Sequence, residues 1–159
     1  MNVKCEPNLA LSLRQQYPSV TAGYHMNKKH WNTVQLDGMI DDWRAFCLSM
    51  PAATEDMPFG PEFLVYKVAG KIFAIFVWQD EPPRMNLKCE PNLALSLRQQ
   101  YPSVTAGYHM NKKHWNTVQL DGTIDEETIQ DWVRASYDLV YASLTKKIRQ
   151  QMVSMTYEV

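Results

Sequence analysis

The hydrophobic positions near the C-terminus follow the spacing of one face of a helix. Because an α-helix brings residues three and four apart onto one side, a stripe with that spacing predicts an amphipathic helix. The stripe consists of Ile129, Trp132, Val133, Ser136, Tyr137, Val140, Tyr141 and Leu144. A shorter stripe of the same kind predicts a helix over residues 40–50, which Pro51 ends.

The middle of the chain carries patterns typical of strands. Residues 62–68 and 71–78 predict two strands joined by a tight turn, and the second is apolar on both faces, as in a central strand. Polar and apolar positions alternate in 85–89, and 115–120 predicts a further short strand. A helix beginning near Pro91 separates these two strands, and residues 53–61 and 103–114 are expected to be loops. This order predicts an α+β two-layer sandwich with a mostly antiparallel sheet packed against helices.

The chain contains a nearly perfect internal repeat. Residues 1–38 and 85–122 match at 37 of 38 positions, and the one difference is Val3 in place of Leu87. Solenoid repeats recur several times and diverge, so a single unchanged copy favours a recent duplication or an engineered insertion. The remaining 121 residues, 39–159, have the size of a complete small domain. We therefore interpret 1–38 as an appended copy of the middle of that domain.

The two copies should compete for one position in the fold. Residues 39–84 offer one helix and two strands to pack against, and we expect the C-terminal copy to hold this place because it continues into the last helix. The N-terminal copy could add to an edge of the same sheet, enter another chain as a domain-swapped dimer, stay loosely ordered, or exchange with the C-terminal copy. We favour self-association, because the spare copy has apolar faces and unpaired strand edges to cover.

Charge and composition restrict the classes of function. The 159 residues contain 16 Lys and Arg against 17 Asp and Glu, a net charge of −1 that argues against a strongly electrostatic nucleic-acid binder. The longest apolar run, 72–78, is too short to cross a membrane, and the first residues lack the apolar core of a signal peptide. Three cysteines without CxxC spacing favour a reducing compartment. These features predict a cytoplasmic protein without a membrane partner.

The densest group of potentially functional residues is 108–118. Lys112 and Lys113 could neutralise phosphates, and Asn111 could hydrogen-bond a backbone or a base edge. Tyr108 and Trp115 could stack on bases. In the alternative interpretation, Trp115 anchors the loop to the core and the lysines are merely solvated.

Other candidate residues surround this group. Arg84 and Lys88 share one face of a predicted strand and could extend a basic surface toward Lys112. His109 and His114 lie five residues apart, whereas a metal-binding pair on one helical face needs four, so we expect no metal site.

No set of residues suggests catalysis. The adjacent acids Glu55 and Asp56 should point apart, and the sequence has neither a phosphate-binding glycine loop nor a nucleophile with its base. We therefore expect no enzymatic activity and no cofactor. Residues 146–149, KKIR, fit the C-terminal end of the last helix, where cations favour the helix dipole, although they could also contact phosphate.

Several segments together resemble the MmcQ/YjbR family of small bacterial proteins. They are residues 47–76, 84–104, 108–122, which include NKKHWNTV, and 134–147, which include SYDLV. The resemblance implies a CyaY-like fold with a double-wing DNA-binding arrangement, and it points to Asn111, Lys112, Lys113, His114 and Trp115. With Tyr108, His109, Arg84 and Lys88, these form the candidate nucleic-acid-binding set. We expect a non-enzymatic DNA-binding protein; the alternative is a protein-interaction or structural module whose duplicated segment drives domain swapping, oligomerisation or conformational switching.

Overall fold

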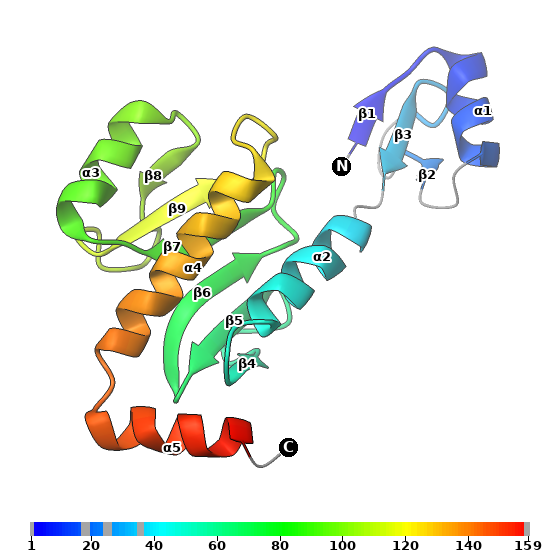
Figure 1. Ribbon diagram of the computed structural model, residues 1–159. Helices are drawn as coiled ribbons and strands as arrows, with labels where there is room; N and C mark the ends of the chain where they lie inside the picture. The colour runs from blue at the N-terminus through cyan, green and yellow to red at the C-terminus, as the bar shows by residue number, and fades with distance from the viewer. Residues whose placement is uncertain (1, 17–19, 24–26, 35–36, 158–159) are drawn as a thin grey trace. The chain divides into compact units, whose positions relative to one another are not determined.

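The computed structural model describes residues 2–16, 20–23, 27–34 and 37–157 (Figure 1). The chain divides into two compact units, residues 1–43 and residues 44–159. Each unit has its own antiparallel sheet. Helix α2 (Asp37–Leu48) crosses the division between the units.

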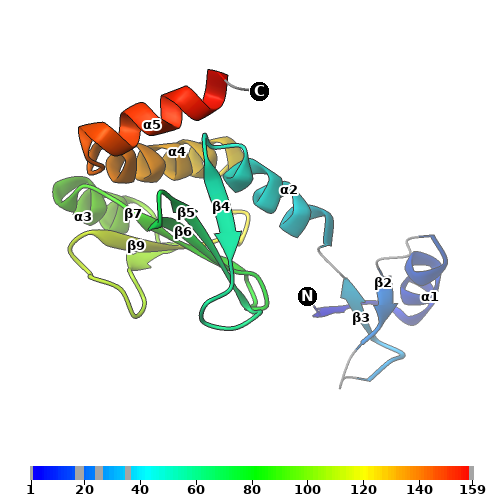
Figure 2. The same cartoon turned by 90° about the horizontal axis from the view of Figure 1, so that it is seen from below.

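The larger unit contains a six-stranded sheet in the order β4-β5-β6-β7-β9-β8, in which every neighbouring pair is antiparallel. Helix α4 lies across one face of this sheet (Figures 1 and 2). This arrangement confirms the predicted α+β class. The strands are β4 (Ala53–Asp56), β5 (Phe63–Val68), β6 (Lys71–Val77), β7 (Arg84–Lys88), β8 (Val104–Ala106) and β9 (Trp115–Gln119), and the further helices are α3 (Pro91–Gln100), α4 (Glu126–Ala142) and α5 (Lys146–Tyr157). None of the helices within the described residues is long and apolar enough to cross a membrane.

The core lies between α4 and the sheet, where five residues of the predicted helical stripe are buried, namely Ile129, Val133, Ser136, Tyr137 and Val140. Tyr137 packs edge-on against Phe73 of β6, with ring centroids 5.3 Å apart. The hydroxyl of Ser136 donates to the Phe73 carbonyl at 2.6 Å and accepts the backbone N–H of Lys88 at 2.8 Å. A single fully buried hydroxyl therefore ties the helix to two adjacent strands.

Three elements differ from the sequence prediction. Strand β4 lies in the predicted loop 53–61, and β8 lies in the predicted loop 103–114, because pairing with β5 and β9 creates them without a strong local pattern. Helix α4 ends at Ala142, and Lys146 begins a separate helix, α5. The prediction that KKIR ends the last helix is therefore wrong, and these cations occupy the first turn of α5.

The smaller unit repeats the fold of its source segment. Its strands pair antiparallel in the order β1-β3-β2, the same order that β7, β9 and β8 have in the larger sheet. It forms a sheet of its own, not an added edge, and the C-terminal copy is the one that joins β6. The elements are β1 (Asn2–Lys4), α1 (Pro7–Gln16), β2 (Val20–Ala22) and β3 (Trp31–Val34).

Equivalent hydrogen bonds stabilise the fold within each copy. The backbone N–H of Cys5 donates to the carbonyl of His30 at 2.6 Å, and Cys89 donates to His114 at 2.7 Å. The side-chain amide of Asn32 donates to Ala10 at 3.1 Å, and Asn116 makes the equivalent bond to Ala94 at 3.3 Å. The duplicated segment therefore encodes its local fold independently of the sheet that surrounds its C-terminal copy.

Candidate nucleic-acid interface

The loop of residues 107–114, here called the basic loop, joins β8 to β9 and begins at Gly107. The Gly107 N–H donates to the Trp115 carbonyl at 2.9 Å, which turns the chain immediately after β8. A Cβ at this position would lie 2.7 Å from the Cβ of Trp115, closer than two carbon atoms can approach. The start of the loop therefore requires glycine.

Arg98 of α3 holds the other side of the basic loop. Its Nε donates to Oδ1 of Asn116 at 2.7 Å, and its Nη2 donates to the carbonyls of Trp115, at 3.2 Å, and Lys112. Asn111 adds an internal turn, because its Oδ1 accepts the N–H of Lys113 at 3.0 Å. The backbone of the loop is thus fixed before any ligand binds.

Five of the predicted contact residues on the loop are exposed, and Asn111, Lys112 and Lys113 follow one another among them. The Lys112 Nζ donates a hydrogen bond of 3.4 Å to the carbonyl oxygen of Gly107. Within the described part of the chain, no carboxylate forms an ion pair with Lys112 or Lys113. The positive charges of both lysines are therefore available to an anion from solution.

Tyr108 contacts both His109 and Arg84 beside the lysines. Tyr108 is 51% exposed as a residue. Its ring centroid lies 4.0 Å from that of His109 and 4.6 Å from the guanidinium carbon of Arg84. Nε of Arg84 also forms an ion pair with Asp80 at 2.8 Å. These contacts engage both the tyrosine ring and the arginine charge within the protein.

The remaining predicted residues lie at the start of β9 and on its neighbour. Trp115 is half-buried and directly opposite Lys88 of β7, so the two side chains leave the sheet on the same face. Asn116 and Val118, which line a cavity beneath α4, leave on the other face. His114 is half-buried, and its carbonyl accepts the Cys89 N–H.

Sequence reasoning missed two residues that position the loop. Met110 packs against the buried cluster of Val65, Ile75 and Val77 on the sheet face away from α4, and so anchors the loop. Arg98 reaches acceptors 14 to 18 residues away, a separation at which no local motif exists. Both residues are repeated in the duplicated segment, but all their neighbours are repeated too, so the repeat does not single them out.

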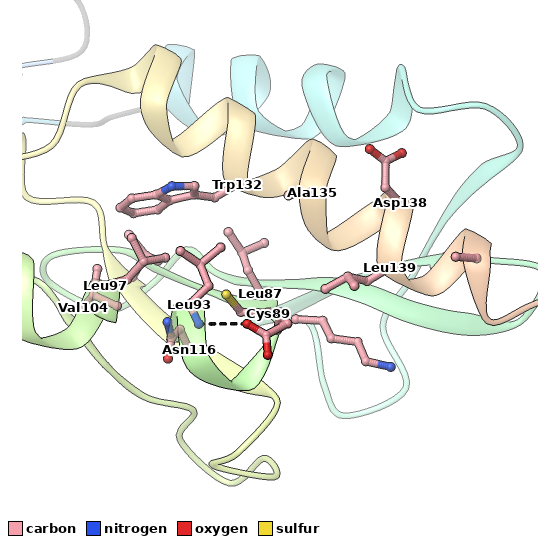
Figure 3. Close-up of a pocket in the computed structure, with 14 residues that line it drawn as sticks. Leu87, Cys89, Leu93, Leu97, Val104, Asn116, Trp132, Ala135, Asp138 and Leu139 are labelled. Atoms are coloured by element: carbon pink, nitrogen blue, oxygen red, sulfur yellow. Dashed lines mark hydrogen bonds between the residues drawn. The ribbon is translucent and has the colours of Figure 1, made fainter. Parts of the chain in front are cut away.

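An apolar cavity of about 350 Å³ lies between α3, α4 and the sheet (Figure 3). Trp132 and Leu139 of α4 line one side, and Leu93 and Leu97 of α3 line the other. The amide of Asn116 borders the cavity, but Arg98 and Ala94 already use its hydrogen-bonding groups. The significance of the cavity is therefore chiefly that it shows α4 covering this side of the C-terminal copy.

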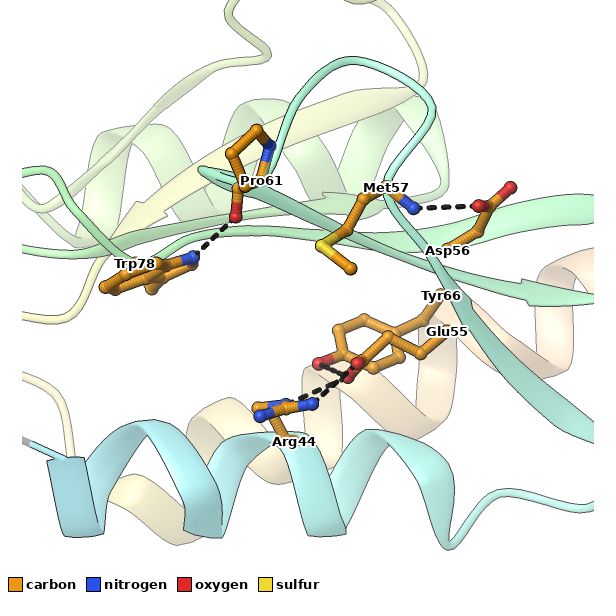
Figure 4. Close-up of polar contacts among 7 residues, drawn as sticks. All are labelled: Arg44, Glu55, Asp56, Met57, Pro61, Tyr66 and Trp78. Atoms are coloured by element: carbon orange, nitrogen blue, oxygen red, sulfur yellow. Dashed lines mark hydrogen bonds and ion pairs between the residues drawn. The ribbon is translucent and has the colours of Figure 1, made fainter.

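The adjacent acids Glu55 and Asp56 point apart, as predicted, because neighbouring strand residues face opposite sides of β4 (Figure 4). Glu55 accepts bonds of 2.8 and 3.1 Å from Arg44 and one of 2.9 Å from the Tyr66 hydroxyl. Hydrogen bonding by Arg44 lowers the pKa of Glu55 despite its partial burial. Asp56 instead binds the Met57 N–H at 2.8 Å and Lys67 at 3.2 Å. Both carboxylates therefore stabilise the fold and do not form an acid–base pair.

Neither a reactive thiol nor a metal cluster lies beside these groups in the described part of the chain. Cys47 is fully buried, and burial raises the pKa of its thiol to about 12. Among the described residues, no three His, Cys, Asp or Glu side chains gather as metal ligands.

Comparison with known proteins gives a consistent set of relatives. The YjbR family model matches residues 1–45 and 48–139. The uncharacterised protein YbdF of Escherichia coli O157:H7 is 38% identical over 109 residues, which are 69% of this chain and 89% of that protein. The uncharacterised protein YjbR of Escherichia coli K12 is 32% identical over 116 residues, covering 73% of this chain and 98% of the relative.

Solved structures show the same fold. The crystal structure of Deinococcus radiodurans protein DR2400, domain DUF419, superposes with a TM-score of 0.68 at 39% sequence identity, covering 71% of this chain and 86% of that one. A Pseudomonas syringae protein superposes with a TM-score of 0.54 at 26% identity, covering 67% of this chain and 98% of the other.

Proposed function

This chain belongs to the YjbR family, and from that premise we propose that it is a non-enzymatic DNA-binding protein whose basic loop contacts the phosphate backbone. The observation that carries the proposal is the exposed pair Lys112 and Lys113, which has no acidic partner among the described residues and lies on a loop fixed by Arg98. Lysines neutralise phosphates and release counterions, and this release provides most of the affinity for DNA.

The rigidity of the basic loop favours binding. Arg98, Gly107 and Met110 fix its backbone from three sides. A loop that is already ordered loses little conformational entropy on association, so more of the electrostatic attraction appears as affinity.

The geometry favours phosphate contacts over base stacking. The Tyr108 ring already contacts His109 and Arg84, and Trp115 is half-buried. Stacking on bases would require these aromatic groups to leave their present contacts. Phosphate contacts fix position without reading sequence, so we propose weak sequence preference.

The N-terminal copy supplies a second exposed pair of lysines. Lys28 and Lys29 are exposed, and Arg14 donates to the carbonyl of Lys28 just as Arg98 does to Lys112. One chain would then carry two contact surfaces, which raises affinity through multivalency when both reach the same DNA.

Fluorescence anisotropy with a random duplex tests the proposal. Replacing Lys112 and Lys113 by Ala should weaken binding by about tenfold or more, because the variant no longer neutralises two phosphates. The matched control replaces Lys146 and Lys147, an exposed lysine pair on α5, and changes net charge equally. Equal weakening in both double variants, or no binding by the wild type at low salt, would overturn the proposal.

A further inference from the structure

The two copies of the duplicated segment have different surroundings at only some positions. Leu87 of the C-terminal copy is 2% exposed, whereas its counterpart Val3 is 40% exposed. Leu97 is buried beneath α4, whereas its counterpart Leu13 is half-buried. Val104 and Val20 differ in the same way.

Another position on the same helix serves as a reference. Leu95 and its counterpart Leu11 are 55% and 56% exposed, so their surroundings are the same in both copies. The difference between the copies includes the face that α4 covers in the larger unit, and along β1 it also includes Asn2 and Lys4, which are more exposed than Asn86 and Lys88. We call this uncovered face of the smaller unit, with Val3, Leu13 and Val20, the spare face.

The spare face also adjoins a strand edge. Strand β7 pairs with β6 on one side and β9 on the other, but its counterpart β1 is the edge strand of a three-stranded sheet. In the larger unit, Asn86 and Leu87, the counterparts of Asn2 and Val3, pair with Ile75 and Ala74 of β6 along the equivalent edge. The C-terminal copy thus shows what this surface is built to contact: another strand in the same sheet and a helix over its apolar face.

Exchange of the copies between chains cannot bury the spare face. Each chain has two copies of the segment but one place for it, between β6 and α4. A swapped copy expels an identical one, so the number of uncovered copies stays the same. Pairing two spare copies with each other instead fills the open edge of β1 in both chains and brings their Val3 side chains together.

We propose that two chains associate through their N-terminal copies, with β1 of one beside β1 of the other and the two spare faces forming one continuous apolar surface. An antiparallel strand pair has a two-fold axis perpendicular to the sheet, so both α1 helices lie on the same side of the joined sheet. With Val3 near the axis, Lys4 lies opposite Asn2 of the second copy, and no like charges meet on this strand pair.

Charge reversal at Val3 tests this assembly in the full-length chain. By sedimentation velocity, the wild type should form a concentration-dependent dimer of twice 18.5 kDa. Val3→Glu and Val3→Lys should each be monomeric, because like charges meet across the axis, and an equimolar mixture of the two should dimerise again. Leu11→Glu is the matched control, since that position is equally exposed in both copies, and it should dimerise like the wild type.

Each outcome of this experiment is decisive for the proposal. A wild type that stays monomeric at every concentration, or a Val3→Glu variant that dimerises like the wild type, overturns it. A mixture of the two charged variants that stays monomeric overturns the symmetric pairing. Rescue by mixing also shows that the single variants are folded, and none of these measurements depends on DNA binding.

Discussion

Arg98 and Asn116 are joined by a hydrogen bond of 2.7 Å from Nε to Oδ1, and the same guanidinium holds two carbonyls of the basic loop and its following strand. The pair therefore connects α3, β9 and the loop. Arg14 and Asn32 repeat this bond at 2.6 Å in the N-terminal copy. Because both copies make this bond, the duplicated segment itself determines where its lysines lie.

Replacing Arg98 by Met should loosen the basic loop. The Oδ1 of Asn116, a residue that is only 3% exposed, would have no donor from the arginine, so we expect a decrease of about 1–3 kcal/mol in the free energy of unfolding. Hydrogen exchange should quicken in residues 107–114, and affinity for duplex DNA should fall. Arg14→Met is the control and should leave exchange in 107–114 unchanged. Unaltered protection in Arg98→Met would contradict the role given to the guanidinium.

Ser136→Ala tests the link between α4 and the sheet. The variant removes the donor to the Phe73 carbonyl and the acceptor of the Lys88 N–H, both in the core. We expect urea unfolding to report a decrease in stability of about 1–3 kcal/mol. Ser154→Ala, at an exposed position on α5, should change stability by less than about 0.5 kcal/mol. Equal effects of the two substitutions would show that the buried hydroxyl has no special importance.

Glu55 should make stability depend on acid pH. Its folded-state pKa is lowered, first by the hydrogen bond from Arg44, so its contribution is full above the unfolded pKa of about 4.3 and is lost as pH falls through the lower folded value. In thermal unfolding between pH 7 and pH 3, Glu55→Gln should reduce the acid-induced fall in Tm. Some fall should remain, because bonds from Thr123 and Ser103 lower the pKa of Asp121 as well. Superimposable profiles for the wild type and the variant would exclude this contribution.

Cys47 should be chemically inert in the folded protein. Burial raises the pKa of its thiol to about 12, so almost no thiolate exists at pH 8 and no reagent reaches the sulfur. Peptide mapping after iodoacetamide treatment should show no label on Cys47 until urea unfolds the chain. Cys89 is half-buried, with its pKa also raised by burial, and should react slowly before unfolding. Rapid labelling of native Cys47 would contradict the described core.

The sequence predicts the elements that carry a strong periodic pattern. Most of the stripe from Ile129 to Val140 is buried as one face of α4, and the Ala69–Gly70 turn joins β5 and β6, with φ of 49° and 78°. Strand β8 escapes prediction, because its three residues are a strand only through pairing with β9. The sequence pattern also hides the start of α5, because neither Gly nor Pro separates this helix from α4.

The candidate site is predictable in composition but not in geometry. The exposure of Lys112 and Lys113 agrees with their polar surroundings in the sequence. The contact of Arg84 with Tyr108 joins residues 24 positions apart, and it depends on the sheet bringing β7 beside β9. Local sequence contains no information about such pairs, so the cation–π contact is visible only in the folded chain.

The salt dependence of duplex binding tests the central proposal most directly. In a plot of log K against log salt concentration, replacing Lys112 and Lys113 by Ala should reduce the slope by about two, one for each phosphate that the variant leaves unneutralised. Replacing Lys146 and Lys147 should leave the slope unchanged. If the wild-type slope is near zero, or if both lysine pairs reduce it equally, the basic loop is not the DNA-contacting surface.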